Sequence, residues 1–235
     1  MKILIAAPLR QKPEIFREYQ KGLDNLIIPD GCEVDRFFVV NDCPEVIPEI
    51  RGAEWVEINS DNVTMYHDHL WTGDLICNMS TYRNLTIRKA LEGGYDFLLS
   101  VDTDLVLEPH TLEYLLKAGK DICAGLFWTN GWSNAWMYDQ ADGYDPEWIN
   151  PGTYRVGGTG ALILISRKVM EAGVDYSPIP NLRKAVFGED RYFCIRAVCN
   201  GFEIWADSHC LPVHLYKEPD YRNFMAGRTK PCFRK

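Results

Sequence analysis

The sequence lacks any apolar run close to the roughly 18–20 residues that a helix needs to cross a bilayer. Its N-terminal apolar run stops at Pro8-Leu9-Arg10, which is short for the apolar region of a secretory signal peptide. We therefore expect no transmembrane segment, a first strand buried in a sheet, and a cytoplasmic location.

A Cys-x-x-Cys pair is also missing, although the chain has eight cysteines. They are scattered along the sequence, and several lie in apolar runs such as 122–124. Scattered cysteines without metal-binding spacing favour buried thiols of a cytosolic protein over disulfides or a zinc site.

Positive charge is in deficit, because 33 acidic side chains against 25 basic ones leave a formal net charge of −8. An acidic chain is a poor candidate for binding nucleic acid, so we expect no nucleic-acid partner. It suits a protein that holds a cation between itself and an anionic ligand. Repeats and low-complexity segments are absent as well, and 46% apolar residues are enough for a sizeable core.

Short apolar runs alternate with amphipathic stretches along most of the chain. Strands are expected at 2–7, 34–40, 54–58, 95–101, 121–127 and 161–165. Helices are expected at 13–26, 80–91, 108–116, 167–172 and 189–200. Strands that alternate with helices predict an α/β fold in three layers.

The sharpest motif is Asp102-Thr103-Asp104, directly after the apolar run 95–101. Side chains two apart on an extended backbone point to the same side, so both carboxylates are expected at the carboxyl end of a strand, where open α/β sheets bind ligands. Two neighbouring carboxylates repel each other, and oxygen ligands suit Mg²⁺ or Mn²⁺. Since Asp-x-Asp is common, a pair of solvated loop aspartates is the alternative.

Four blocks of the sequence, in this order and spacing, resemble the core of GT-A-fold glycosyltransferases, particularly those like family 2. The blocks are 81–90, 94–104 with 108–109, 157–167 and 188–197. The resemblance runs from the first strand to about His214. It implies a Rossmann-like, three-layer α/β/α sandwich with a mostly parallel central sheet. The second strand departs from the family pattern, because it ends in Asn41-Asp42-Cys43 rather than in an acidic pair.

The resemblance implies a site for Mn²⁺ or Mg²⁺. The ion is expected on Asp104, assisted by Asp102 through the ribose or a water, with His214 as a further ligand. Such an ion would neutralise the charge that develops on the diphosphate leaving group. A packed or capping role is the alternative for His214.

The resemblance also places the nucleotide at the ends of the first strands. The expected contacts are Pro8, Arg10, Asp42 and Thr103. Arg83 is expected either to contact the diphosphate or to hold Asp102, and an exposed helix arginine is the alternative.

Glu189 and Asp190 occupy the position of the family's catalytic carboxylate. In inverting members this Asp takes the proton from the acceptor hydroxyl, and Glu189 is expected to orient the acceptor or Asp190. Acids that merely stabilise a helix N-terminus are the alternative. The nearby glycines of 157–160 allow close approach to a sugar or acceptor, or form a plain turn.

Three further segments carry weaker signals. The Trp-rich segment 128–152 is expected on the acceptor side, or else its aromatics pin a loop. His67-Asp68-His69 is weak evidence for a second metal site, and a mobile loop over the donor is the better interpretation. The basic tail 216–235 is also compatible with weak contact to a membrane surface.

The chain is therefore interpreted as one domain, with a nucleotide-binding half at 1–104, an acceptor and catalytic half at 105–215, and the tail. The expected function is metal-dependent transfer of a sugar from a UDP- or GDP-sugar to a carbohydrate or other hydroxyl acceptor, with inversion. The alternatives are a retaining glycosyltransferase, a nucleotidylyltransferase of the same fold, and a non-catalytic sugar- or nucleotide-binding module.

Overall fold

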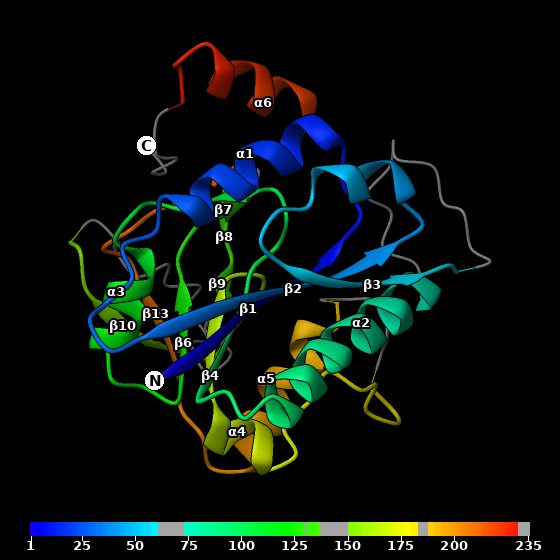
Figure 1. Ribbon diagram of the computed structural model, residues 1–235. Coiled ribbons are helices and arrows are strands. Elements are labelled where there is room, and N and C mark those ends of the chain that lie inside the picture. The colour runs from blue at the N-terminus through cyan, green and yellow to red at the C-terminus, as the bar shows by residue number, and fades with distance from the viewer. Residues whose placement is uncertain (61–72, 130, 137–149, 183–187, 230–235) are drawn as a thin grey trace.

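The computed structural model describes residues 1–60, 73–129, 131–136, 150–182 and 188–229. Its centre is an eight-stranded sheet in the order β10-β13-β6-β12-β4-β1-β2-β3 (Figure 1). The strands are β1 (Lys2–Leu9), β2 (Glu33–Asn41), β3 (Glu54–Ile58), β4 (Phe97–Ser100), β6 (Ile122–Gly125), β10 (Thr153–Val156), β12 (Ile163–Ser166) and β13 (Ile204–Asp207). In the ranges described, no helix has the length and apolar character needed to cross a membrane.

The sheet is mostly parallel. β12 runs antiparallel to both of its neighbours, β4 and β6, and β10 runs antiparallel to β13. β1 pairs with β2 on one side and β4 on the other, in parallel. Every residue of β1 after Lys2 is buried, which is why this strand reads as a continuous apolar run.

Helices cover both faces of the sheet (Figure 1). One face carries α1 (Pro13–Asp24) and α3 (Thr111–Lys117), which share a buried cluster with one face of β1. The other carries α2 (Gly73–Glu92), α4 (Arg167–Glu171) and α5 (Asp190–Cys199), which share a second cluster. On α1, the apolar spacing of Phe16, Tyr19 and Leu23 puts all three against the sheet.

Several short elements lie outside the central sheet. Three two-stranded ribbons pair β5 (Leu105–Val106) with β14 (Val213–His214), β7 (Trp128–Thr129) with β8 (Trp132–Ser133), and β9 (Ala135–Trp136) with β11 (Gly158–Thr159). A 3₁₀ helix, η1, spans Pro44–Glu49, and the basic tail forms α6 (Glu218–Met225). β5 and β7 directly follow β4 and β6, so both ribbons lie beyond the carboxyl ends of sheet strands.

The predicted α/β class with a mostly parallel sheet is confirmed. Most boundaries differ from expectation by one to three residues, and the largest difference is that α2 spans Gly73–Glu92 rather than 80–91. Neither β13 nor α6 was predicted, because β13 has only three consecutive apolar residues before Asp207 and a charged tail helix gives a weak periodic signal.

The cysteines are free thiols throughout the part of the chain that the structure describes. Cys43, Cys123, Cys194 and Cys210 are buried, as expected, whereas Cys199 is exposed on α5.

Candidate active site

The carboxyl ends of β1 and β2 form one side of the candidate site. Asp42 follows β2 with a φ of 49° and accepts hydrogen bonds from the backbone and side chain of Ser60, beyond the end of β3. The Tyr82 hydroxyl on α2 interacts with Ser60; burial raises the pKa of Tyr82, Asp42 adds to the shift, and Arg10 opposes it. Arg10 and Asp42 therefore both act electrostatically on Tyr82. Pro8 is buried inside β1, opposite Val39.

Asp102 and Asp104 lie in a turn and not on an extended backbone. The amide of Leu105 donates to the carbonyl of Asp102 over 3.1 Å, which closes the turn between β4 and β5. Both residues lie beyond the carboxyl end of β4 as expected, but the expectation of an extended backbone with both side chains on the same side is wrong. Asp102 contacts α2, Asp104 faces β14, and Thr103 between them is buried.

Arg83 on α2 is the centre of a buried polar network. Its Nε donates to Glu189 Oε1 over 2.7 Å, Nη1 donates to Ser100 Oγ over 3.1 Å, and Nη2 donates to Asp102 Oδ1 over 2.8 Å. Nε also lies 3.9 Å from Asp190 Oδ1. Because its side chain is only 2% exposed, Arg83 is not the exposed helix arginine that was the alternative, and its charged partners are carboxylates.

Glu189 and Asp190 have different environments although they are adjacent. The Glu189 side chain is 2% exposed and is held by Arg83, whereas the Asp190 side chain is 21% exposed. Burial raises the pKa of Asp190 well above its usual range, and the guanidinium of Arg83 opposes that shift, while Glu189 and Asp102 add to it. Asp190 is thus the carboxylate that combines access with raised basicity, as a general base needs.

Gly160 makes room for Asp190. A Cβ atom added at Gly160 would collide with the Asp190 carboxylate, so no other residue fits there without displacing it. Gly158 similarly lies under the indole of Trp136. The expected role of the glycines of 157–160 was to let a sugar or acceptor come close to the backbone. In the structure, Gly158 and Gly160 instead let side chains of the same chain come close.

The Tyr176 ring packs against this network. Its ring stacks on Phe193 of α5 with centroids 4.7 Å apart, and the Arg83 guanidinium carbon lies 5.6 Å from its centroid. Tyr176 is 1% exposed, and its backbone amide donates to Asn84 Oδ1 on α2. The Tyr176 ring therefore packs between the Arg83 guanidinium and Phe193 of α5.

Asp104 and His214 meet on the other side of the turn. His214 Nε2 lies 3.3 Å from Asp104 Oδ2, and its Nδ1 lies 3.1 Å from Thr129 Oγ1 and 3.4 Å from the Trp128 carbonyl oxygen. Burial lowers the pKa of His214, but the charge and hydrogen bond of Asp104 outweigh it, so that the pKa is raised overall. The imidazole thus faces a carboxylate with one nitrogen and β7 with the other.

This carboxylate–imidazole pair fits a divalent cation in its donor set, since both groups bind Mn²⁺ and leave other positions open. Within the described ranges, however, no three His, Cys, Asp or Glu side chains gather as a metal group. The expected trio is therefore not assembled: Asp104 and His214 converge, while Asp102 Oδ1 is taken by Arg83.

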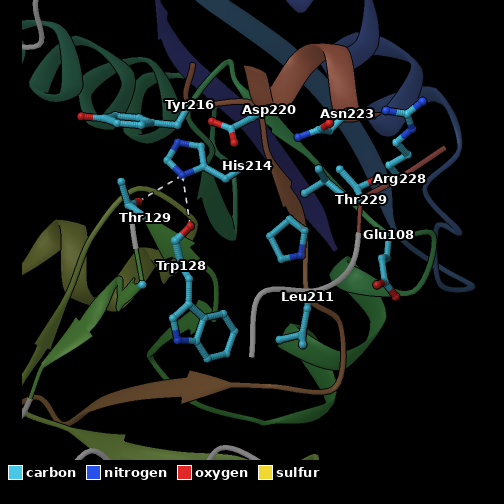
Figure 2. Close-up of a pocket in the computed structure, with 13 residues that line it drawn as sticks. Glu108, Trp128, Thr129, Leu211, His214, Tyr216, Asp220, Asn223, Arg228 and Thr229 are labelled. Atoms are coloured by element: carbon cyan, nitrogen blue, oxygen red, sulfur yellow. Dashed lines mark hydrogen bonds between the residues drawn. The ribbon is translucent and has the colours of Figure 1, made fainter. Parts of the chain in front are cut away.

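A pocket of about 610 Å³ opens beside His214 (Figure 2). It lies between β7, the segment leading into β14, and the tail with α6, and the His214 ring forms part of its wall. Trp128 lines it, so one aromatic residue of the Trp-rich segment stands next to the candidate site. Residues 137–149 of that segment, and the expected sites at His67 and His69, lie outside the described residues.

Sequence reasoning missed several polar groups of the site. Ser100 and Tyr82 both stand inside the motif blocks that carry the family resemblance, so their positions were a usable signal. Tyr176 and Ser60 come from segments without regular structure, and Thr129 from a two-residue strand. No periodic pattern marks these residues.

Solved structures share this fold. S. aureus TarS 1–349 in complex with UDP-GlcNAc aligns with a TM-score of 0.56 and 13% identity, over 90% of this chain and 58% of that one. The mannosyltransferase PcManGT from Pyrobaculum calidifontis, in complex with GDP-Man and Mn²⁺, aligns with a TM-score of 0.54 and 9% identity, over 96% of this chain and 61% of that one. No protein-family model matches the chain, and no curated protein matches its sequence.

At such identities the likeness establishes the fold, and it confirms the predicted GT-A architecture. The chain spans about 60% of the length of the TarS 1–349 chain that it matches.

Proposed function

We propose that the chain is a metal-dependent glycosyltransferase, similar to family 2, that moves a sugar from a nucleotide-diphosphate sugar to an acceptor hydroxyl with inversion. The observation that carries the proposal is the Arg83 network, because one buried guanidinium joins the turn after β4 to the two carboxylates that begin α5. The solved structures with UDP-GlcNAc and GDP-Man support a UDP- or GDP-sugar as donor.

In the proposed mechanism Asp190 accepts the proton of the acceptor hydroxyl as that oxygen attacks the anomeric carbon. Glu189 is too buried to reach a substrate, and it orients Asp190 by holding Arg83. Arg83 keeps Asp102 and the catalytic pair in one fixed arrangement, rather than contacting the diphosphate.

Asp104 and His214 would hold Mn²⁺ or Mg²⁺, with Asp102 assisting from the neighbouring position. The ion would supply a positive charge that stabilises the departing diphosphate. Arg10 and Asp42 would contact the nucleotide at the ends of β1 and β2. Pro8 and Thr103 would contribute through their backbone, because both residues are buried.

A donor screen tests the proposal. The chain is incubated with UDP-, GDP- and other nucleotide-sugars in the presence of Mn²⁺, and release of nucleoside diphosphate is measured. Release of the diphosphate from one donor supports glycosyl transfer or hydrolysis. Formation of a nucleoside triphosphate and a sugar phosphate from the donor and added pyrophosphate would indicate a nucleotidylyltransferase. Binding of the donor without turnover would indicate a non-catalytic module.

We predict that nucleoside diphosphate binding depends on the metal through Asp104. Calorimetry with the diphosphate of the preferred donor should show binding with Mn²⁺ and little in excess chelator. Asp104→Ala should abolish the Mn²⁺-dependent part, because it removes the carboxylate that faces His214 at the proposed metal position. Asp30→Ala, at an exposed turn position before β2, is the control. Equal affinity with and without chelator would contradict the metal role.

We also predict that Mn²⁺ binding weakens at acid pH. The pKa of His214 is raised above its usual 6.5, so the ring is protonated at a higher pH than an ordinary histidine. A protonated imidazole cannot be a ligand, and Mn²⁺ must displace its proton. Mn²⁺ affinity, measured by electron paramagnetic resonance, should therefore fall as the pH decreases through this pKa, with proton release on binding. An affinity that does not change between about pH 8 and pH 6 would remove His214 from the ligand set.

A further inference from the structure

The pocket beside His214 has no role in the mechanism above. Its volume of about 610 Å³ is within the range of about 300–1,000 Å³ that is typical of small-molecule sites. Its walls come from β7, from residues 211–214 and from the tail, which the chain brings together only in the fold. Figure 2 shows Trp128 on one side and Tyr216, Asp220 and Asn223 on the opposite side.

The lining combines aromatic surface with hydrogen-bonding groups of both kinds. Trp128 and Tyr216 supply flat apolar surface. Around them stand carboxylates, an amide, a guanidinium and hydroxyls, from Glu108, Asp220, Asn223, Arg228, Thr129 and Thr229. A sugar ring presents the matching surfaces, because its C–H face is apolar and each hydroxyl both donates and accepts hydrogen bonds.

The charge of the lining argues for a neutral ligand. Glu108 and Asp220 line the pocket together with Arg228 and His214, so its described lining carries groups of both signs and no cluster of positive charge alone. One oxygen of Asp220 already accepts the backbone N–H of Lys217 at the start of α6, and this bond fixes the carboxylate in place. An anionic ligand such as a phosphate would meet two carboxylates, whereas hydroxyl groups can use both signs.

The position of His214 connects the pocket to the candidate reacting centre. Its Nε2 faces Asp104, and its Nδ1 faces Thr129 and Trp128, which line the pocket. A ligand held in the pocket would therefore lie one imidazole ring away from the proposed metal position.

We infer that this pocket is a subsite for a neutral carbohydrate and that the acceptor hydroxyl belongs to a sugar. This inference rests on the proposed function. The tail is then part of the acceptor site, with α6 positioned by an ion pair between Glu218 and Lys12 beyond the end of β1.

Saturation-transfer NMR tests the inference. The probes are the methyl α- and β-glycosides of glucose, galactose, mannose and N-acetylglucosamine, with inorganic phosphate as competitor. At least one glycoside should bind and should not be displaced by phosphate. Asn223→Ala should weaken its binding by about fivefold, as expected for one lost hydrogen bond, whereas Arg222→Ala on the same helix should not.

A second pair of variants tests the aromatic wall. Trp128→Ala should weaken glycoside binding further, and Trp55→Ala on the edge strand β3 is its matched control. If no glycoside binds, if phosphate displaces the glycoside, or if Asn223→Ala and Trp128→Ala both bind it as the unaltered chain does, the inference is wrong.

The outcomes separate this inference from the proposed function. In the presence of the donor found in the screen, the bound glycoside should become the glycosylated product. Metal-dependent donor hydrolysis without any glycoside binding would overturn the sugar subsite and leave the proposed function standing. Glycoside binding without turnover of any donor would overturn the proposed function and, with it, the acceptor role of the pocket.

Discussion

Asp190→Asn is expected to lower the turnover of sugar transfer by about 10²–10⁴-fold, the usual effect of losing a general base. The amide keeps the shape of the carboxylate but cannot accept the proton of the acceptor hydroxyl. In the unaltered chain, burial raises the pKa of the Asp190 carboxyl, so activity should increase as the pH rises through that pKa. This acidic limb of the pH–rate profile should be absent in the variant. Steady-state kinetics over a pH series measures both effects.

The same variant should bind the donor within a few-fold of the unaltered chain, because Asp190 lies next to Gly160 and Arg83 and not at the nucleotide end of the site. Asp24→Asn is the matched control, since its carboxylate is exposed and pairs with Arg36 on the surface. NMR of the product that the unaltered chain makes from an α-linked donor should show a β-linkage. Near-normal turnover would remove Asp190 from catalysis, and an α-linked product would exclude single displacement.

The fold was largely predictable from the sequence because burial leaves a composition signal. β1 and β4 lie in the middle of the sheet and are covered on both faces, so their segments read as continuous apolar runs. α1 has apolar residues on one face only, and its spacing shows in the sequence. The signal fails for β13, where only three consecutive apolar residues precede Asp207.

The candidate site was predictable in position but not in side-chain direction. Strand ends mark where Asp42, Asp102 and Asp104 lie. The turn closed by Leu105, however, sends the two carboxylates of the motif to different partners, and no local pattern indicates that turn. For Arg83, the sequence offered Asp102 as one of two alternative partners. It did not indicate Glu189 or Ser100, because an arginine on a helix resembles a surface residue until α5 and the β4 turn are in place.

Arg83 is therefore expected to matter for stability as much as for catalysis. Arg83→Met fills similar space without a charge, and it leaves Glu189 buried without its cation. Removing one partner of a buried ion pair costs about 3–5 kcal/mol, so the free energy of unfolding should fall by that amount in a urea titration. Arg88→Met, at an exposed position of α2, is the control and should change the free energy of unfolding by less than about 0.5 kcal/mol.

If Arg83 had a structural role alone, its replacement would lower stability without changing the pH profile of activity. Arg83→Lys provides the second measurement. A lysine keeps the positive charge, but a single ammonium group cannot reproduce three directed bonds to Glu189, Ser100 and Asp102. Because Arg83 lowers the pKa of Asp190, its replacement by Met should move the acidic limb of the pH profile to higher pH, whereas Lys should retain most of the original position. If both variants lose stability and neither moves that limb, Arg83 supports the fold and does not tune Asp190. If Met moves the limb and Lys restores it, the positive charge at position 83, which lies 3.9 Å from Asp190 in the unaltered chain, sets the pKa of the base.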